Sequence, residues 1–330
     1  MSGSRSLAPV FVGGCPRSGT TLLRTMLNAH PDIAIPHETR ILIEGYRRRA
    51  EWGDLAEPEN RRRVARWVVE RKESRYRWLT EDADELVERM VAAAPTIGSV
   101  LSAGFRLYAE RHGKPRWGEK RPSVALHLDV VFAMFPNARY VNIVRDPRAA
   151  VASIREVGRQ YGWGAHDVPG GTDTWERSAR AADRWRRRLG ADRFIELRYE
   201  DLVGDPAAAL GRIVAFLDLD PAGLEAMIRY HETADSQNLQ PLASKPVTTH
   251  RLRAWEQALA PREVAFVERV LGAWMRHYGY EPAATGVAVP EDLRRRHRRR
   301  RNEMRLEATK RRARDSWLRL TYRRSVAAVP

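Results

Sequence analysis

The chain has 330 residues, 43% of them apolar, which suffices for the core of one globular domain with an appendage. Of its net charge of +16, residues 291–330 carry +10 (15 Lys and Arg against 5 Asp and Glu), which leaves +6 for the first 290 residues. A single cysteine, Cys15, excludes an intramolecular disulfide, and the apolar run near the start is too short for a signal sequence or a membrane span. We therefore expect a cytoplasmic protein.

The first predicted elements are a strand, a loop and a helix. Residues 8–14 read APVFVGG, a short apolar run that ends in glycines. Residues 20–30 follow as TTLLRTMLNAH, with Leu22, Leu23, Met26 and Leu27 at helical spacing. Residues 31–38 (PDIAIPHE) are a weaker strand candidate, and the charged residues 46–112 indicate a helical insertion without a clear strand.

Further along the chain, strands and helices alternate. Residues 139–145 and 193–202 are rich in β-branched or aromatic side chains and predict two strands. Residues 123–135 and 205–217 have helical patterns, the second opened by Asp205 as N-cap and Pro206 at the first helical position. This order predicts an α/β, P-loop-like three-layer fold with a central, mostly parallel sheet flanked by helices. Residues 1–290 would form the domain and 291–330 a basic C-terminal helix or a disordered tail.

The loop between the first strand and helix predicts an anion site. Its sequence GGCPRSGTT has the outline of a phosphate loop, in which backbone N–H groups and the helix dipole converge on one point. Gly19 permits the tight turn, and the hydroxyls of Ser18, Thr20 and Thr21 add donors. A nucleotide triphosphatase has a lysine where this chain has Thr20, so the loop lacks the group that neutralises a γ-phosphate.

A second basic stretch, IVRDPRAAVAS, predicts a separate anion site. Arg145 ends a predicted strand, and Ser153 lies about two helical turns further on. Asp146 stands between two arginines, which argues against a magnesium site. An arginine fork and a hydroxyl can hold a second phosphate.

These motifs carry a family resemblance. PRSGTT, RDPRAAVAS and RYEDL resemble the phosphosulfate loop and 3′-phosphate motif of sulfotransferases that use 3′-phosphoadenosine 5′-phosphosulfate (PAPS). The runs GGCPRSGTTLLRTMLNAHPDIAIPHETR, EKRP, FPNARYVNIVRDPR and KPV are similar in order and spacing to tyrosylprotein sulfotransferases and their bacterial relatives. The likeness extends from about residue 9 to residue 280. It explains the missing lysine, because PAPS has no γ-phosphate and carries its second charge at the 3′ position.

The resemblance implies a role for each matching residue. Glu38 would be the general base in an in-line transfer of the sulfuryl group to an acceptor hydroxyl, with Lys120 and Arg17 as the cations around that group. Arg40 would lie on the acceptor side, although Glu38 and Arg40 could instead form an exposed ion pair. The residues implied in binding the nucleotide donor are Arg17, Ser18, Gly19, Thr20, Thr21, Arg145, Ser153, Tyr199 and Lys245. PAPS would be the co-substrate and 3′,5′-adenosine bisphosphate (PAP) the product, with no metal required.

Several alternatives stay open from the sequence. The acceptor can be a peptide tyrosine, a carbohydrate, a lipid or a phenolic small molecule, and the oligomeric state is undetermined, with a homodimer among the options. Rival functions are a P-loop kinase-like phosphotransferase, which would need magnesium, and a basic nucleic-acid-binding protein. The tail is either a peripheral contact with an anionic membrane or a solvated arm.

Overall fold

The computed structural model describes residues 7–162, 164–232 and 245–321. The chain divides into two compact units. The first comprises Met1–Gly14, Gly19–Val144 and Ala181–Thr248, and the second comprises Cys15–Ser18, Arg145–Arg180 and Thr249–Pro330. The phosphate loop crosses from the first unit to the second and back within a few residues.

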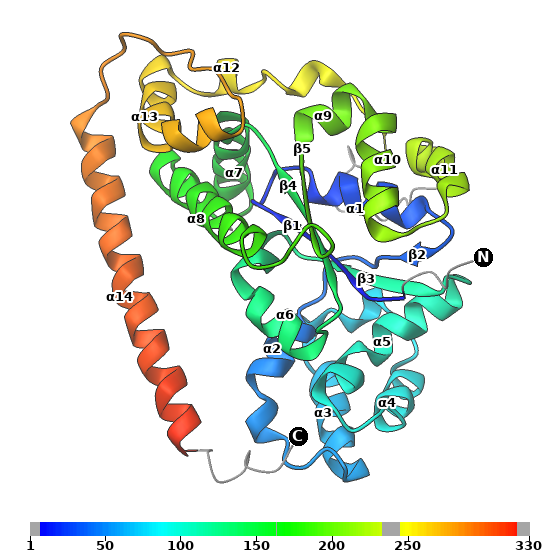
Figure 1. The fold of residues 1–330 in the computed structure, drawn as a ribbon. Coiled ribbons are helices and arrows are strands. Elements are labelled where there is room, and N and C mark those ends of the chain that lie inside the picture. The colour runs from blue at the N-terminus through cyan, green and yellow to red at the C-terminus, as the bar shows by residue number, and fades with distance from the viewer. Residues whose placement is uncertain (1–6, 163, 233–244, 322–330) are drawn as a thin grey trace. The chain divides into compact units, whose positions relative to one another are not determined.

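The first unit is built on a five-stranded sheet in which every strand pair is parallel, in the order β2-β3-β1-β4-β5 (Figure 1). The strands are β1 (Val10–Gly14), β2 (Ile33–Ala34), β3 (Arg116–Lys120), β4 (Arg139–Val144) and β5 (Phe194–Arg198). This confirms the predicted α/β fold with a parallel sheet. Parallel strands need crossover connections, and helices provide them here.

Strand β3 was not predicted from the sequence, although it lies between β1 and β2 in the sheet. Its residues RWGEK include three charged side chains, so no apolar alternation marks it as a strand. All five are nevertheless buried. Arg116 is accommodated because its guanidinium donates hydrogen bonds to the carbonyl oxygens of Ala8 and Leu217.

Helices cover both faces of this sheet. On one face α1 packs against α11, and α10 packs against both α9 and α11. On the other face α2 packs against α5 and α6, and α5 also packs against α3 and α4. The helices of this unit are α1 (Thr20–Ala29), α2 (Leu42–Arg47), α3 (Pro58–Glu70), α4 (Ala83–Val91), α5 (Ile97–Arg111), α6 (Leu128–Met134), α9 (Tyr199–Gly204), α10 (Pro206–Leu217) and α11 (Leu224–Ile228).

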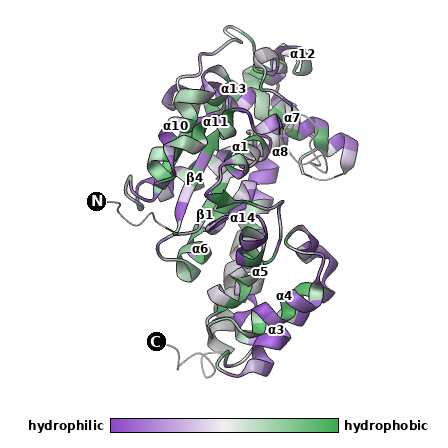
Figure 2. Cartoon of the chain, turned by 90° about the vertical axis from the view of Figure 1, so that its right-hand side faces the viewer, coloured by the Kyte–Doolittle hydropathy of each residue, from purple (hydrophilic) through white to green (hydrophobic). Residues whose placement is uncertain are grey.

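Local signals place several of these helices. Asp205 caps α10 by accepting a hydrogen bond from the N–H of Ala208, as predicted. The predicted helix over residues 123–135 consists of a 3₁₀ helix (Pro122–His127) followed by α6. Between β2 and β3 the structure has helices only, and α3 and α4 show alternating apolar and polar residues along their length (Figure 2).

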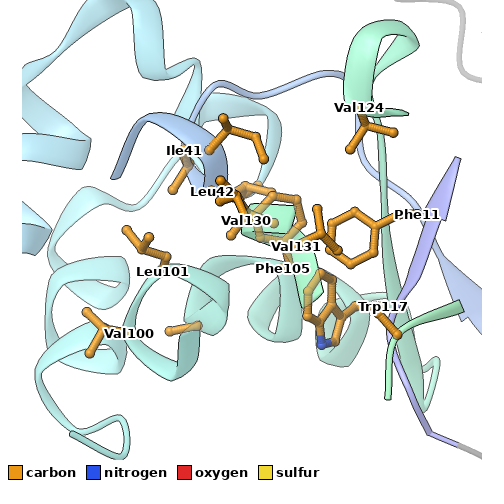
Figure 3. Packing of buried hydrophobic residues seen from close by; sticks show 14 of the residues in the cluster. Phe11, Ile41, Leu42, Val100, Leu101, Phe105, Trp117, Val124, Val130 and Val131 are labelled. Carbon is orange, nitrogen blue, oxygen red and sulfur yellow. The ribbon is translucent and has the colours of Figure 1, made fainter. Parts of the chain in front are cut away.

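The main hydrophobic core lies between the sheet and the α5–α6 layer (Figure 3). Phe11 of β1 packs edge-on against Trp117 of β3, with ring centroids 6.0 Å apart. Trp117 in turn contacts Phe105 of α5 at 5.2 Å. Side chains on this sheet face therefore point toward the insertion helices.

The second unit is helical. It holds α7 (Pro147–Tyr161), most of α8 (Val168–Arg186), α12 (Trp255–Ala258), α13 (Pro261–His277) and α14 (Glu291–Thr321). Arg148 joins these elements, because its guanidinium donates to Asp146, to Glu268 of α13 and to the carbonyl of Glu281. It also lies over the Trp255 ring at 4.2 Å.

The basic C-terminal segment forms α14, whose first turns pack on other helices of the second unit. Leu293 and His297 are buried, His297 meets the edge of the Phe266 ring, and Arg301 pairs with Glu176 of α8. Residues 322–330 of the predicted tail lie outside the described residues. Within the described part of the chain, every helix is too short or too polar to cross a membrane.

Candidate active site

The phosphate loop has the backbone geometry that anion binding requires. Gly19 has φ 92°, and a Cβ added there would lie 2.4 Å from the Tyr199 ring, so only glycine fits. Gly14 is equally restricted, because a Cβ would lie 2.3 Å from the carbonyl oxygen of Ile143. Helix α1 starts after Gly19 without a side-chain cap, and its first turn has no acidic residue. Its N-terminal N–H groups are thus available to an anion.

The hydroxyl residues of the loop are buried. Thr20 and Thr21 open α1, and Ser18 precedes Gly19. Cys15 lies close to Ser18 and Ser178, and burial raises the pKa of its thiol to about 12. A thiol with this pKa is not a nucleophile at neutral pH, so Cys15 fills space in the loop.

Three arginines and a serine gather in the second unit. Arg17, at φ 70°, donates from Nε to the Ser153 hydroxyl at 3.1 Å. Arg145 donates to the carbonyl oxygens of Arg17 at 3.0 Å and Arg251 at 3.2 Å. Burial lowers the pKa of Arg17, and the charges of Arg145 and Arg251 lower it further. Like charges at such proximity favour a bound anion.

This cluster combines residues that the sequence assigned separately. Arg145 and Ser153 were predicted to hold the 3′-phosphate, whereas Arg17 was placed beside the sulfuryl group. Arg17 was also predicted to bind the donor, and in the structure its side chain donates to the Ser153 hydroxyl. Arg251 was missed, and only its position shortly after the KPV motif could have drawn attention to it.

Tyr199 and Lys245 belong to the first unit. The Tyr199 ring packs on Gly19 at the start of α1. The backbone of Lys245 is fixed by a hydrogen bond from the Tyr230 hydroxyl to its carbonyl oxygen. Burial raises the pKa of Tyr230 to about 12, with a contribution from Tyr199, which places both tyrosines in one neighbourhood.

An ion pair joins Glu38 to Lys120 in the first unit. Lys120 ends β3, and its Nζ lies 3.3 Å from Oε2 of Glu38, with side-chain exposures of 8% and 29%. Burial lowers the pKa of Lys120, and Glu38 opposes that shift. The carboxylate is thus partly exposed, whereas the ammonium is buried. Glu38 is paired with Lys120, not with the exposed Arg40, whose N–H donates to the Ser74 carbonyl.

Arg24, which was not predicted as a site residue, and His37, the alternative candidate for the base, flank this pair. Arg24 of α1 is buried, and its Nη1 lies 3.0 Å from Nδ1 of His37. Because arginine only donates hydrogen bonds, Nδ1 of His37 must accept this one. The His37 ring also contacts Trp78, at 4.4 Å between centroids. His37 therefore contacts both Arg24 and Trp78.

Comparisons with known proteins identify the family. The model of the sulfotransferase family matches residues 9–222. The chain is 26% identical over 299 residues to protein-tyrosine sulfotransferase A of Caenorhabditis elegans, covering 86% of this chain and 70% of the relative. It is 27% identical over 295 residues to protein-tyrosine sulfotransferase of Drosophila melanogaster, covering 85% of this chain and 53% of the relative.

A solved structure shares the fold. It is the sulfotransferase domain of the Synechococcus PCC 7002 olefin synthase, with a TM-score of 0.53 and 24% sequence identity. The match covers 82% of this chain and 97% of that domain. The family match spans well over half of the chain, including the phosphate loop, Lys120 and the Arg145–Ser153 motif. The chain therefore belongs to the sulfotransferase family of enzymes.

Proposed function

We propose that the chain transfers a sulfuryl group from PAPS to an acceptor hydroxyl, with Glu38 as the general base. The observation that carries this proposal is the Glu38–Lys120 pair, in which a buried cation holds a partly exposed carboxylate at 3.3 Å. A base must reach the acceptor hydroxyl, and a cation must face the oxygen that gains charge as the S–O bond breaks. The pair supplies both groups from adjacent positions.

Each charged residue then has a distinct task. Glu38 takes the hydroxyl proton while the acceptor oxygen bonds to sulfur and the bond from sulfur to the 5′-phosphate oxygen breaks. Lys120 stabilises the charge that develops on that phosphate oxygen. The N-terminus of α1 and the hydroxyls of Thr20 and Thr21 bind the 5′ side of the donor.

The arginine cluster of the second unit supports PAPS as the donor. Arg17, Arg145 and Arg251 bring three positive charges to the neighbourhood of the Ser153 hydroxyl. A 3′-phosphate would relieve their mutual repulsion and accept charge-assisted hydrogen bonds. ATP has no 3′-phosphate, and Asp146, the candidate metal ligand of a kinase, accepts hydrogen bonds from Arg148.

Donor binding can be tested without knowledge of the acceptor. Calorimetric titration with PAP and with ATP, in the absence of metal, should show clear preference for PAP. Equal affinity, or an ATP affinity that requires magnesium, would contradict the donor assignment.

For the acceptor we propose a phenolic hydroxyl, with a tyrosine side chain of a peptide as the first candidate. This rests on the similarity to the protein-tyrosine sulfotransferases of C. elegans and D. melanogaster. Transfer from radiolabelled PAPS should be compared among a tyrosine peptide, its phenylalanine counterpart, 4-nitrophenol and a monosaccharide. A label that appears in the monosaccharide and not in the phenols would contradict the phenolic assignment.

A further inference from the structure

A short segment of the helical insertion lies against the loop that carries Glu38. It spans residues 72–78 and consists of two 3₁₀ helices. The N–H of Arg40, which lies on the Glu38 loop, donates to the carbonyl oxygen of Ser74 at 3.1 Å. The buried Ser74 hydroxyl donates to the carbonyl oxygen of Val68 in α3 at 2.6 Å. The segment is therefore anchored on one side to the Glu38 loop and on the other to α3.

The segment ends in Trp78, whose ring contacts the residue that precedes Glu38. The ring centroids of Trp78 and His37 are 4.4 Å apart, with an angle of 41° between the ring planes. His37 is held in turn by Arg24 of α1, whose Nη1 donates to Nδ1 of His37 over 3.0 Å. A row of three side chains thus joins α1, the Glu38 loop and the insertion.

The histidine of this row lies on the same side of the sheet as Lys120. Side chains alternate along a strand, so Gly118 and Lys120 of β3 face away from the main hydrophobic core. A Cβ added to Gly118 would lie 3.0 Å from the Ile35 side chain, so Ile35 packs on this face. His37 follows Ile35 at the next position of the same parity and contacts Arg24 of α1, a helix that packs against β3. The row therefore adjoins the face from which Lys120 meets the proposed base.

We propose that Trp78 determines acceptor specificity by binding the aromatic ring of the acceptor beside Glu38. The inference rests on the proposed function, because it takes the acceptor to be a phenol. A phenol whose hydroxyl meets Glu38 holds its ring close to that carboxylate. The indole of Trp78 is partly exposed, whereas Tyr76 and Leu79 beside it are buried. It offers a wide, rigid aromatic face to a second ring at small cost in conformational entropy.

The surroundings of Trp78 hold the indole in place before an acceptor binds. Arg24 fixes the His37 ring, and Ser74 fixes the segment that ends in Trp78. Arg75, between the two 3₁₀ helices, has φ 57°, a conformation that a non-glycine residue keeps only where the surrounding structure imposes it. A surface fixed in advance lowers the ordering cost of binding. Because the indole contacts the acceptor ring and not the reacting atoms, it should act on the KM of the acceptor and leave kcat unchanged.

Steady-state kinetics with PAPS and 4-nitrophenol test this assignment. Trp78→Ala should raise the KM for 4-nitrophenol about three- to tenfold, the equivalent of one aromatic pair, with kcat unchanged. Trp78→Phe retains a ring and should recover most of the loss. The matched control is Trp274→Ala, which removes a partly exposed indole of α13 that contacts the His277 ring and should leave KM unchanged. The affinity for PAP, measured by calorimetry, should be the same in all of these proteins.

Calorimetry of 4-nitrophenol with the PAP-loaded protein measures acceptor affinity without turnover, and should show the same loss in Trp78→Ala. If that variant fails to fold, Trp78→Leu keeps an apolar side chain without a ring and should lose as much affinity. A fall in kcat or in PAP affinity at unchanged KM would show that Trp78 only supports the Glu38 loop. A wild-type chain that transfers no sulfuryl group to phenols would refute the proposed function itself, whereas an unshifted KM in an active enzyme would refute the role of Trp78 alone.

Discussion

Two groups of charged side chains in this molecule differ in how their charges are balanced. In the first unit Lys120 lies 3.3 Å from the carboxylate of Glu38. In the second unit Arg17, Arg145 and Arg251 repel one another around Ser153. A balanced pair is suited to moving a proton, because its members change charge at modest cost. A cluster of like positive charges is suited to binding an anion, because the ligand supplies the negative charge that balances them.

The largest expected effect comes from removing the basicity of the balanced pair. Glu38→Gln should lower sulfuryl transfer by roughly 10²–10⁴-fold, the usual range for a general base, with unchanged PAP affinity. The loss should be smaller for acidic phenols, whose hydroxyl needs less help to ionise. Initial rates with radiolabelled PAPS, and calorimetry with PAP, measure the two quantities.

A suitable control for that variant is Glu44→Gln, since Glu44 also forms a partly buried ion pair, with Arg71. It should retain wild-type transfer. A Glu38→Gln enzyme that still used an alkyl alcohol at the wild-type rate would mean that another group is the base, and His37→Gln would be the next variant to make.

Arg148 and Arg145 sharpen the comparison, because both lie near the start of α7. Carboxylates balance the charge of Arg148, whereas Arg145 donates hydrogen bonds to backbone carbonyl oxygens. Arg148 is 7% exposed and pairs with Asp146 and Glu268, which are almost as buried. Arg148→Ala should lower the free energy of unfolding by about 3–5 kcal/mol, because two carboxylates would be left buried without their partner. Urea denaturation measures this loss. A change below about 1 kcal/mol would mean that these ion pairs stabilise the fold no more than exposed surface pairs do.

The Glu119 carboxyl makes stability depend on pH in a stated direction. Burial raises its pKa in the folded chain to about 7, against an ordinary value of 4.5. The unfolded chain therefore loses this proton first, so the folded state binds more protons between these values and its stability falls as pH rises. Glu119→Gln removes that cost. It should exceed wild type by about 3 kcal/mol near pH 8 and match it near pH 4. Denaturation curves at the two pH values decide; equal stability at both would mean that Glu119 titrates normally.

Arg145→Ala should have little effect on stability and a specific effect on binding. Loss of a charge-assisted hydrogen bond should weaken PAP binding by about 1.5–3 kcal/mol, and weaken adenosine 5′-monophosphate much less. Calorimetry with both ligands measures the difference. Because Arg145 also holds the Arg17 carbonyl, equal weakening of both ligands would mean that it only supports the loop.

The smallest effect concerns the exposed, arginine-rich face of α14. We propose that it contacts anionic membranes from the cytoplasmic side. Replacing Arg295 and Arg298 with glutamine should weaken flotation with phosphatidylserine vesicles by about 1 kcal/mol for each charge. The same replacements at Arg66 and Arg187, which are exposed elsewhere, should not. Equal flotation of the two double variants would leave α14 a solvated helix.

The sequence by itself determined the elements whose signals are local. The apolar run and glycines of residues 8–14, the phosphate loop and α1 follow one another as predicted. The predicted cap at Asp205 likewise depends on neighbours within a few residues. The family motifs also selected Glu38, Lys120, Arg145 and Ser153 as candidate site residues, and of these inferences the family itself is confirmed.

Only the tertiary structure decided which of these residues meet. Strand β3 was not predicted because its side chains are charged. The partners of Arg116 and Lys120 are distant in the sequence, and the carboxyl of Glu119 has no hydrogen-bond partner among the described residues. Lys120 meets Glu38 across 82 residues, and Arg17 meets Ser153 across 136. Local patterns fix backbone conformation through short-range sterics and hydrogen bonds, whereas burial and distant partners fix the charge state and orientation of a side chain. That is why Glu119 carries no signal in the sequence and an unpaired carboxyl in the fold.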